Sequence, residues 1–541
     1  MKNYDDLIRK ITEQNTQLIE ENRRIKDCLD IALNTISLQA EEIQRLKDEI
    51  AILKGQKPRP KIPPSLLEGP KNKDKQNNKQ KHSRGKHPRR QKTNQLDIHA
   101  RNRIKPDSIP EGAIFKGCQK YTVQDIILRS YNTIYEIERW QLPDGTYLTG
   151  KLSQNIQGHY GPQLISFILH QYYGCRVTEP LLLIQLKEIG VLISKGQLSN
   201  ILIQRKEVFH QEKNEMLLAG IEATGQIKVD DTGARHQGKN GYSTIIGNDF
   251  FTFIVSTKSK SRINFLQILN GADPRYLINE DTADYIEALK PSHWLGGYLL
   301  LQTRNRSMSK AEWEKFLLKI NIQSNADIKL VTEAALFASL IENGIPRDLG
   351  VHGDDAGQFN VFIRSLCWIH EERHYRKLIP IDEATRCKIE EVRGEIWDLY
   401  NGLKEYKITP TESLKSILEQ DFDNLFRKKK TISPTLNKQL AKTYAKKDKL
   451  LRVLERPGTP LHNNGTETDA REMVVKRKVS GGTRSKEGQR CRDTFVSLKK
   501  TCGKLGITFL NYLEDRVNGI FEIPMLEKVI FTRSSMAPNG P

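Results

Sequence analysis

The chain has 541 residues, with 86 Lys and Arg against 66 Asp and Glu, and therefore a formal net charge of +20 and a pI near 9.4. Its length predicts several domains, because globular units contain roughly 100–200 residues each. The sequence lacks both a run of about 18 apolar residues and a signal peptide, so the excess positive charge favours nucleic acid over a membrane as partner, and we expect a cytoplasmic protein.

The first predicted element is a coiled coil over residues 1–54. Apolar residues follow one heptad register for seven heptads, with Ile8 at position a and Ile11 at position d. Ile at a with Leu at d favours two parallel strands, and Asn15 and Asn22 at a fix the register. We therefore expect a homodimer, or a higher oligomer, through a parallel coiled coil. The alternative is a single amphipathic helix packed on its own domain.

Residues 55–112 are predicted to form a basic linker rich in Pro and Lys. Residues 71–92 contain ten Lys or Arg and one acid, Asp74. A segment with this charge cannot fold by itself. We expect it to contact DNA phosphates without sequence preference, and a solvated spacer is the alternative.

Residues 113–160 are predicted to form a small β-hairpin module. The turn signal Pro143–Thr146 separates β-forming residues at 135–137 from those at 147–148.

Residues 161–222 predict a helix-turn-helix-like DNA-binding module. Helical periodicity occurs at 163–173, 179–188 and 195–205, and Gly190 breaks it. In such a motif the second helix enters a major groove. Any helical hairpin with a glycine turn fits this pattern, so a purely structural hairpin is the alternative. The side chains predicted to read DNA are Lys195, Gln197 and Asn200.

The candidate catalytic residues are two aspartate pairs and one distant glutamate. Asp230-Asp231 and Asp354-Asp355 each follow a short apolar run, and Glu467 ends an Asn-Asn-Gly-Thr-Glu segment. Acid pairs at strand ends are also ordinary turn formers. Carboxylates brought together from all three places, however, are the ligands that a pair of Mg²⁺ ions requires.

The order of elements over residues 223–377 predicts the first part of an RNase-H-like α/β catalytic domain with helical insertions. Strands are expected at 227–230, 241–247 and 250–257, and a fourth from Leu349. This order places the first two acids on neighbouring central strands.

Two further segments complete the predicted domain order. Residues 378–461 are charged and helix-rich, as expected of a helical insertion, and residues 462–541 hold the glutamate helix and basic C-terminal helices. Basic side chains near the acids are candidate DNA phosphate contacts, with a solvated basic face as the alternative. They are Arg373, Arg471, Lys476, Arg477 and Lys478.

Four ordered motifs resemble those of insertion-sequence-66 family DDE transposases, which are enzymes of bacterial mobile elements. They are Val229–Arg235, Gly353–Phe359, Cys367–Arg373 and Asn463–Glu467, and Ser497–Ile507 is similar to the closing helix of that family. The resemblance implies a DNA transposase acting on terminal inverted repeats and target DNA, with accessory element-encoded proteins as candidate partners.

The resemblance also implies the chemistry. It assigns the DDE triad to Asp230, Asp354 and Glu467, with Asp231 and Asp355 as the alternatives. Two Mg²⁺ or Mn²⁺ ions bound there would support phosphodiester hydrolysis and then strand transfer.

The chain departs from the family pattern at several positions. Cys118 stands alone where members carry a cysteine-rich zinc-binding patch, so the hairpin module is interpreted as a degenerate zinc-binding region without zinc. His462 replaces an acid and Thr468 replaces an arginine. A catalytically decayed DNA-binding regulator and a metal-dependent nuclease without strand transfer are therefore the alternative functions.

Two interpretations concern the surroundings of the acids. Cys367 and His370 are interpreted as structural residues near the site, because no second ligand pair has a spacing that would complete a zinc site. The first two acids are 354 − 230 = 124 residues apart, which is wide for the family and predicts an insertion around 272–325.

Overall fold

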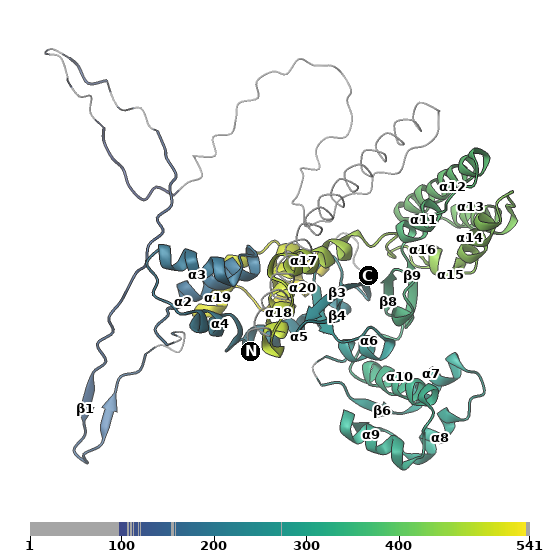
Figure 1. Cartoon of the computed structure of the whole chain (residues 1–541), viewed down its shortest axis with the longest axis horizontal. Coiled ribbons are helices and arrows are strands. Elements are labelled where there is room, and N and C mark those ends of the chain that lie inside the picture. Colours follow the sequence, from purple (N-terminus) through teal and green to yellow (C-terminus); the bar gives the residue numbers. More distant parts are fainter. Residues whose placement is uncertain are drawn as a thin grey trace, which may run out of the picture. The chain divides into compact units, whose positions relative to one another are not determined.

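The computed structural model describes residues 97–536, except 105–107, 109–110, 112, 117, 119–120, 153–155, 157 and 272. The predicted coiled coil of residues 1–54 and most of the basic linker lie outside the described residues and remain predictions. The chain divides after Gln204 into two compact units, of which the structure describes residues 97–204 and 205–536. Figure 1 labels their elements.

A β-hairpin occurs in the N-terminal unit, with strands β1 (Arg139–Gln141) and β2 (Tyr147–Thr149) antiparallel. The prediction that the first strand includes residues 135–137 is wrong. The Asp144 carboxylate accepts hydrogen bonds from the Thr146 N–H at 2.9 Å and hydroxyl at 2.6 Å, and Leu142 N–H donates to Thr146 O at 2.7 Å. This tight turn sets the register, so the residues nearest to it form the strands.

Helices of this unit match the predicted periodicity closely. They are α2 (Pro162–Leu169), a π-helical turn (His170–Gly174), α3 (Glu179–Glu188) and α4 (Lys195–Ile203). Gly190, with φ of +84°, supplies the left-handed residue that ends α3. The Ser194 side chain caps α4 by accepting from the Gln197 N–H, and Leu182, Leu186 and Leu198 are buried between the helices. Whether this helical hairpin reads DNA stays a prediction.

The C-terminal unit contains a mixed five-stranded sheet in the order β5-β4-β3-β8-β9. Its strands are β3 (Gln226–His236), β4 (Lys239–Gly247), β5 (Thr252–Thr257), β8 (Gly350–Gly353) and β9 (Ile363–Leu366). β3, β4 and β5 form an antiparallel meander, and β8 and β9 add in parallel after a long helical crossover. Gln237 and Gly238, with φ of +49° and +74°, form the two-residue turn between β3 and β4. This architecture fits the predicted RNase-H-like α/β fold, with the first acid on β3 and the second directly after the neighbouring β8.

Helices cover both faces of this sheet. α17 and α18 pack on one face, where Ile254 of β5 contacts Ala470, Met473 and Val496. The bounds of the helices around the sheet are α5 (Glu207–Glu222), α6 (Arg262–Leu269), α10 (Asn325–Glu342), α11 (Trp368–Arg376), α17 (Asn464–Ser480), α18 (Lys486–Lys504), α19 (Phe509–Asn518) and α20 (Leu526–Ser535). No helix in the described part of the chain is both long enough and apolar enough to cross a membrane.

The two segments predicted as insertions form distinct structures. Within 272–325, β6 (Tyr276–Ile278) pairs with β7 (Arg306–Met308), and the accompanying helices are α7 (Glu280–Leu289), α8 (Leu295–Gln302) and α9 (Lys310–Lys319). Residues 378–461 form α12 (Glu383–Ile408), α13 (Glu412–Asp423), a π-helical turn (Asn424–Lys428), α14 (Pro434–Tyr444), α15 (Lys447–Leu450) and α16 (Arg452–Glu455). The latter helices enclose their own apolar core around Trp368 and Phe422.

Candidate active site

The three predicted catalytic acids come from three different elements of the C-terminal unit. Asp230 lies on β3, Asp354 directly follows β8, and Glu467 lies in the first turn of α17. Lys228 of β3 pairs with His352 of β8 in a parallel register. Asp230 and Asp354 each stand two residues beyond this pair, so both backbones reach the same level of the sheet.

The members of the first aspartate pair lie on opposite faces of the sheet. Asp230 is opposite Ile245, and Ile245 packs against Ala470 and Met473 of α17. Because side chains alternate along a strand, Asp230 shares the face covered by α17, which we call the carboxylate face. Asp231 points to the other face, where its carboxylate accepts hydrogen bonds from Thr244 Oγ1 at 2.6 Å and Gln358 Nε2 at 2.7 Å.

The members of the second aspartate pair also have different partners. Asp355 is about half exposed, and its carboxylate forms a 2.9 Å ion pair with Lys446, which also contacts Glu371 at 3.0 Å. Asp354 Oδ1 accepts a hydrogen bond from the Ala356 N–H at 3.2 Å, and the Asp354 carbonyl accepts one from Arg364. Asp355 is thus engaged by the helical insertion, whereas Asp354 is oriented by the loop that follows β8.

The negative charges of Asp354 and Glu467 affect the ionisation of Asp230. The pKa of Asp230 is raised to about 7, mainly by burial; a hydrogen bond from the Asp231 N–H lowers it, and the negative charges of Asp354, Glu467 and Asp231 contribute to the rise. Asp354 and Glu467 are therefore close enough to Asp230 to disfavour its ionised form. A bound cation removes this cost, because it reverses the sign of the local potential.

Glu467 lies beside two side chains of α11, Arg373 and His370. Arg373 Nη2 lies 3.4 Å from Glu467 Oε2, and His370 Nε2 lies 3.6 Å from Glu467 Oε1. Glu467 Oε1 and Asn463 Oδ1 are buried acceptors without a hydrogen-bond partner in the described structure, which fits a site for a cation or water. Nevertheless, no group of three or more His, Cys, Asp or Glu among the described residues is arranged to hold a metal ion.

Cys367 and His370, interpreted from the sequence as structural, flank the start of α11. Cys367 is the N-cap residue of this helix and is buried. Burial raises the pKa of its thiol to about 11, so the thiol stays protonated and is a poor metal ligand. His370 contacts both Glu467 and Arg373, at 3.6 and 3.2 Å, and so lies against the acids.

Among the predicted DNA contacts on α17, the prediction for Lys476 is wrong. Lys476 is only 1% exposed, because it falls on the same helical face as the buried Asp469 and Met473. Arg477 is half-buried, and its guanidinium donates a hydrogen bond to the Gly233 carbonyl of β3. Arg471 and Lys478 are exposed. These two retain the accessibility that a phosphate contact requires.

The predicted DNA contacts on α4 are all exposed. Gln197 is nevertheless engaged locally, because its Oε1 accepts hydrogen bonds from the Ser194 N–H at 3.1 Å and the Tyr160 hydroxyl at 2.9 Å. Asn200 Oδ1 accepts from Gln204 Nε2 at 3.1 Å. Lys195, in the first turn, extends its charge into solvent beyond this cap.

Two residues near the acids were missed by sequence reasoning. Asn463 Nδ2 donates to the Val229 carbonyl at 2.9 Å and so ties the glutamate loop to β3 beside Asp230. Asp469 Oδ2 accepts from Thr252 Oγ1 at 2.6 Å and Lys504 Nζ at 2.8 Å, which anchors α17 to β5 and α18. Their positions in the sequence could have indicated them. Asn463 begins the Asn-Asn pair that precedes Glu467, and Asp469 lies two residues after Glu467 on the buried side of α17.

Comparisons with known proteins place this geometry in context. A family profile described as Transposase IS66 family matches residues 357–491, which include the helices from α11 to the start of α18. A protein of Sinorhizobium fredii (strain NBRC 101917 / NGR234), named uncharacterized protein y4jO, is 38% identical over 304 residues. That match covers 56% of this chain and 94% of the relative. No solved structure matches the chain significantly.

Proposed function

The chain belongs to the Transposase IS66 family, and on that premise we propose that it is a DNA transposase with Asp230, Asp354 and Glu467 as its catalytic triad. The proposed reaction is hydrolysis of a phosphodiester bond at an element end, followed by strand transfer into target DNA. The observation that carries the proposal is the convergence of these three acids, from two paired strands and one distant helix, on one face of the sheet.

The donor set suits hard divalent cations. Two bound Mg²⁺ or Mn²⁺ ions would supply an activated water and stabilise the leaving 3′ oxygen. Asp230 is held on a central strand, and the Asn463 hydrogen bond to Val229 keeps the glutamate loop beside it. The buried Oε1 of Glu467 without a hydrogen-bond partner supports a ligand role for this residue.

Arg373 is proposed to connect the acids with DNA. It uses two N–H groups on Glu467 and His370, and a guanidinium has five donors in all, so donors remain for a phosphate. Arg471 and Lys478 on α17, and Lys195 and Asn200 on α4, are the exposed residues that we propose as further contacts.

The remaining parts of the proposal concern assembly. We propose that residues 1–54 form a parallel coiled coil that makes the protein a dimer or higher oligomer, and that the basic linker contacts DNA. Terminal inverted repeats and target DNA are the proposed partners, together with accessory element-encoded proteins. The substitutions at His462 and Thr468 leave the three acids in place, and Thr468 Oγ1 donates to the Asn464 carbonyl at 2.9 Å within its own helix.

The decisive experiment is a strand-transfer assay with Mg²⁺ or Mn²⁺ that exploits the two aspartate pairs. Asp230→Asn, Asp354→Asn and Glu467→Gln should each reduce activity on the order of 10³-fold, because several kcal/mol of transition-state stabilisation are lost. Asp231→Asn and Asp355→Asn are matched controls, with the same chemical change at adjacent positions that face other partners. They should retain activity within about tenfold.

Three outcomes would contradict the proposal in different ways. Activity that survives all three triad substitutions would remove the catalytic assignment. Wild-type protein that cuts DNA without joining it would be a metal-dependent nuclease. Wild-type protein that binds DNA but neither cuts nor joins it would be a decayed regulator.

A further inference from the structure

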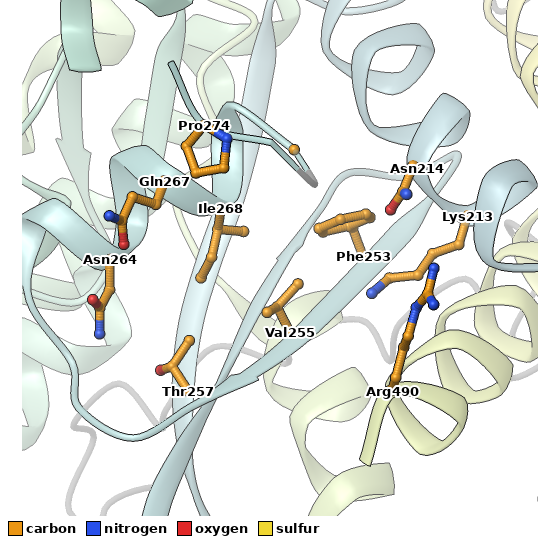
Figure 2. A pocket seen from close by; sticks show the side chains of 11 residues that line it. Lys213, Asn214, Phe253, Val255, Thr257, Asn264, Gln267, Ile268, Pro274 and Arg490 are labelled. Atoms are coloured by element: carbon orange, nitrogen blue, oxygen red, sulfur yellow. The ribbon is translucent and has the colours of Figure 1, made fainter. Parts of the chain in front are cut away.

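A second candidate site lies on the face of the sheet opposite to Glu467. A cavity of about 510 Å³ is lined by residues of α5, β5, α6 and α18 (Figure 2). Phe253 and Val255 of β5 form part of its wall, whereas Ile254 between them packs against α17 on the carboxylate face. Because side chains alternate along β5, the cavity and the catalytic acids are on opposite sides of the sheet. We call the side with Phe253 the cavity face.

Two cations converge on one end of this cavity. Lys213 is only 6% exposed, and its Nζ lies 4.3 Å from the centre of the Phe253 ring. Figure 2 shows its ammonium beside the guanidinium of Arg490. Within the part of the chain that the structure describes, neither cation makes a hydrogen bond or an ion pair. A buried ammonium without such a partner is costly, so an anion would be stabilised here.

The nearby acid Asp493 only partly offsets the cost of burying Lys213. Burial lowers the pKa of Lys213 to about 8; the carboxylate of Asp493 opposes this shift and the charge of Arg490 adds to it. The oxygens of Asp493 are already engaged by Ser256, whose N–H and hydroxyl donate at 2.7 and 2.8 Å. Asp231 is also on the cavity face, but it lies on β3, two strands from β5, and is hydrogen-bonded to Thr244 and Gln358.

Most of the remaining lining is apolar, with the amide of Asn214 near the cations and two further amides at the far end. Figure 2 shows Val255 and Ile268 between the cations and the side chains of Asn264 and Gln267. Asn264 Nδ2 donates to Ser259, and Gln267 Nε2 donates to the Tyr276 hydroxyl at 2.9 Å. Their side-chain carbonyl oxygens are acceptors that a ligand could use.

We propose that this cavity binds one nucleotide, with its phosphate at Lys213 and Arg490 and its base against the apolar wall. The amino group of a base such as adenine or cytosine would donate to the amide oxygens of Asn264 and Gln267. The cavity volume lies within the range of about 300–1,000 Å³ that is usual for small-ligand sites. Exposed Lys258 and Lys260, which directly follow β5, would attract further phosphates of a strand. The nucleotide is either free or part of DNA, and its chemistry is the same in both cases.

The test uses the full-length protein without divalent metal. It measures the affinity of the protein for three ligands: dAMP, inorganic phosphate and a short single-stranded oligonucleotide. Lys213→Met and Arg490→Gln should each weaken dAMP binding about tenfold or more, because a charged contact to the phosphate is lost. Lys319→Met, at an exposed position of α9, is the matched control and should leave binding unchanged. Circular dichroism verifies the fold of each variant, and Arg490→Gln, at an exposed position, keeps the test valid if Lys213→Met unfolds.

These measurements distinguish a free nucleotide from a nucleotide within DNA, and the cavity from the proposed catalytic site. If the variants weaken both dAMP and the oligonucleotide, the nucleotide belongs to DNA, and if they weaken dAMP alone, it is a free nucleotide. Equal affinity for phosphate and dAMP, or equal binding by Lys213→Met, Arg490→Gln and Lys319→Met, would overturn the proposal. Asp230→Asn should still bind dAMP normally, so failure of the catalytic assignment and failure of this site are distinguishable.

Discussion

Each face of the five-stranded sheet holds a cluster of like charges, negative on one face and positive on the other. On the carboxylate face, Asp230 is half-buried near Asp354 and Glu467, whose negative charges disfavour its ionised form. On the cavity face, Lys213 is buried beside Arg490 without an anionic partner in contact with it in the described chain. Both arrangements cost stability in the free protein. One sheet can therefore separate a cation site from an anion site, because alternate side chains of a strand point to opposite faces.

The largest predicted effect is stabilisation of the carboxylate face by metal. Mn²⁺ at about 100 times its Kd should raise the free energy of unfolding of the wild type by about 2.7 kcal/mol, because the ion binds only the folded chain. Thermal unfolding with and without Mn²⁺ measures this shift. Asp230→Asn should lose most of it, whereas Asp231→Asn should retain it. An equal shift in both variants would mean that Mn²⁺ binds elsewhere.

A smaller effect is expected from Asp230→Asn in the absence of metal. Removing this half-buried carboxylate relieves repulsion and should stabilise the folded chain by roughly 1 kcal/mol. Denaturant unfolding in chelator measures the change. Asp231→Asn is the control, and it should be neutral or destabilising because Thr244 and Gln358 already donate to this carboxylate. A destabilised Asp230→Asn would show that repulsion is not the dominant cost at this position.

The corresponding change on the cavity face is Lys213→Met without nucleotide. It replaces a buried ammonium with an apolar side chain of similar size and should stabilise the chain by roughly 0.5–1 kcal/mol. Lys319→Met, which is exposed, should change the free energy of unfolding by less than about 0.5 kcal/mol. A clear loss of stability in Lys213→Met would show that the Phe253 contact outweighs the cost of burying the charge.

The smallest predicted effect concerns the restraint on Glu467. Arg373→Gln removes the cation that lies 3.4 Å from Glu467 Oε2, so this carboxylate becomes freer to bind a cation. The affinity for Mn²⁺, measured by calorimetry, should rise about threefold, which corresponds to less than about 1 kcal/mol. Arg376→Gln, at an exposed position on the same helix, is the control. Weaker Mn²⁺ binding in Arg373→Gln would mean that Arg373 orients Glu467 for the metal.

Local patterns predicted much of the fold. The α3 helix has the predicted bounds, 179–188, because proline in its first turn and a left-handed Gly190 after it are local signals. The strands β4 and β8 lie where their apolar runs predicted them, whereas β3 continues to His236, well beyond its predicted end at Asp230. The errors occurred where side-chain contacts determine a strand boundary or the exposure of a residue. The Asp144 turn shifted β1, and the helical phase of α17 buried Lys476.

The candidate site divides in the same way. By itself, the sequence determined the strand that carries Asp230-Asp231, the strand that Asp354-Asp355 follow, and the helix that carries Glu467. Only the tertiary structure decided that Asp230, rather than Asp231, faces α17, and that Asp355 is drawn to Lys446. The cavity on the other face could not be predicted either. The physical reason is that periodicity depends only on residues close together in the sequence. The face of the sheet that becomes a site depends instead on contacts with distant segments. One example is the hydrogen bond from Asn463 to the Val229 carbonyl, which joins residues more than 200 positions apart.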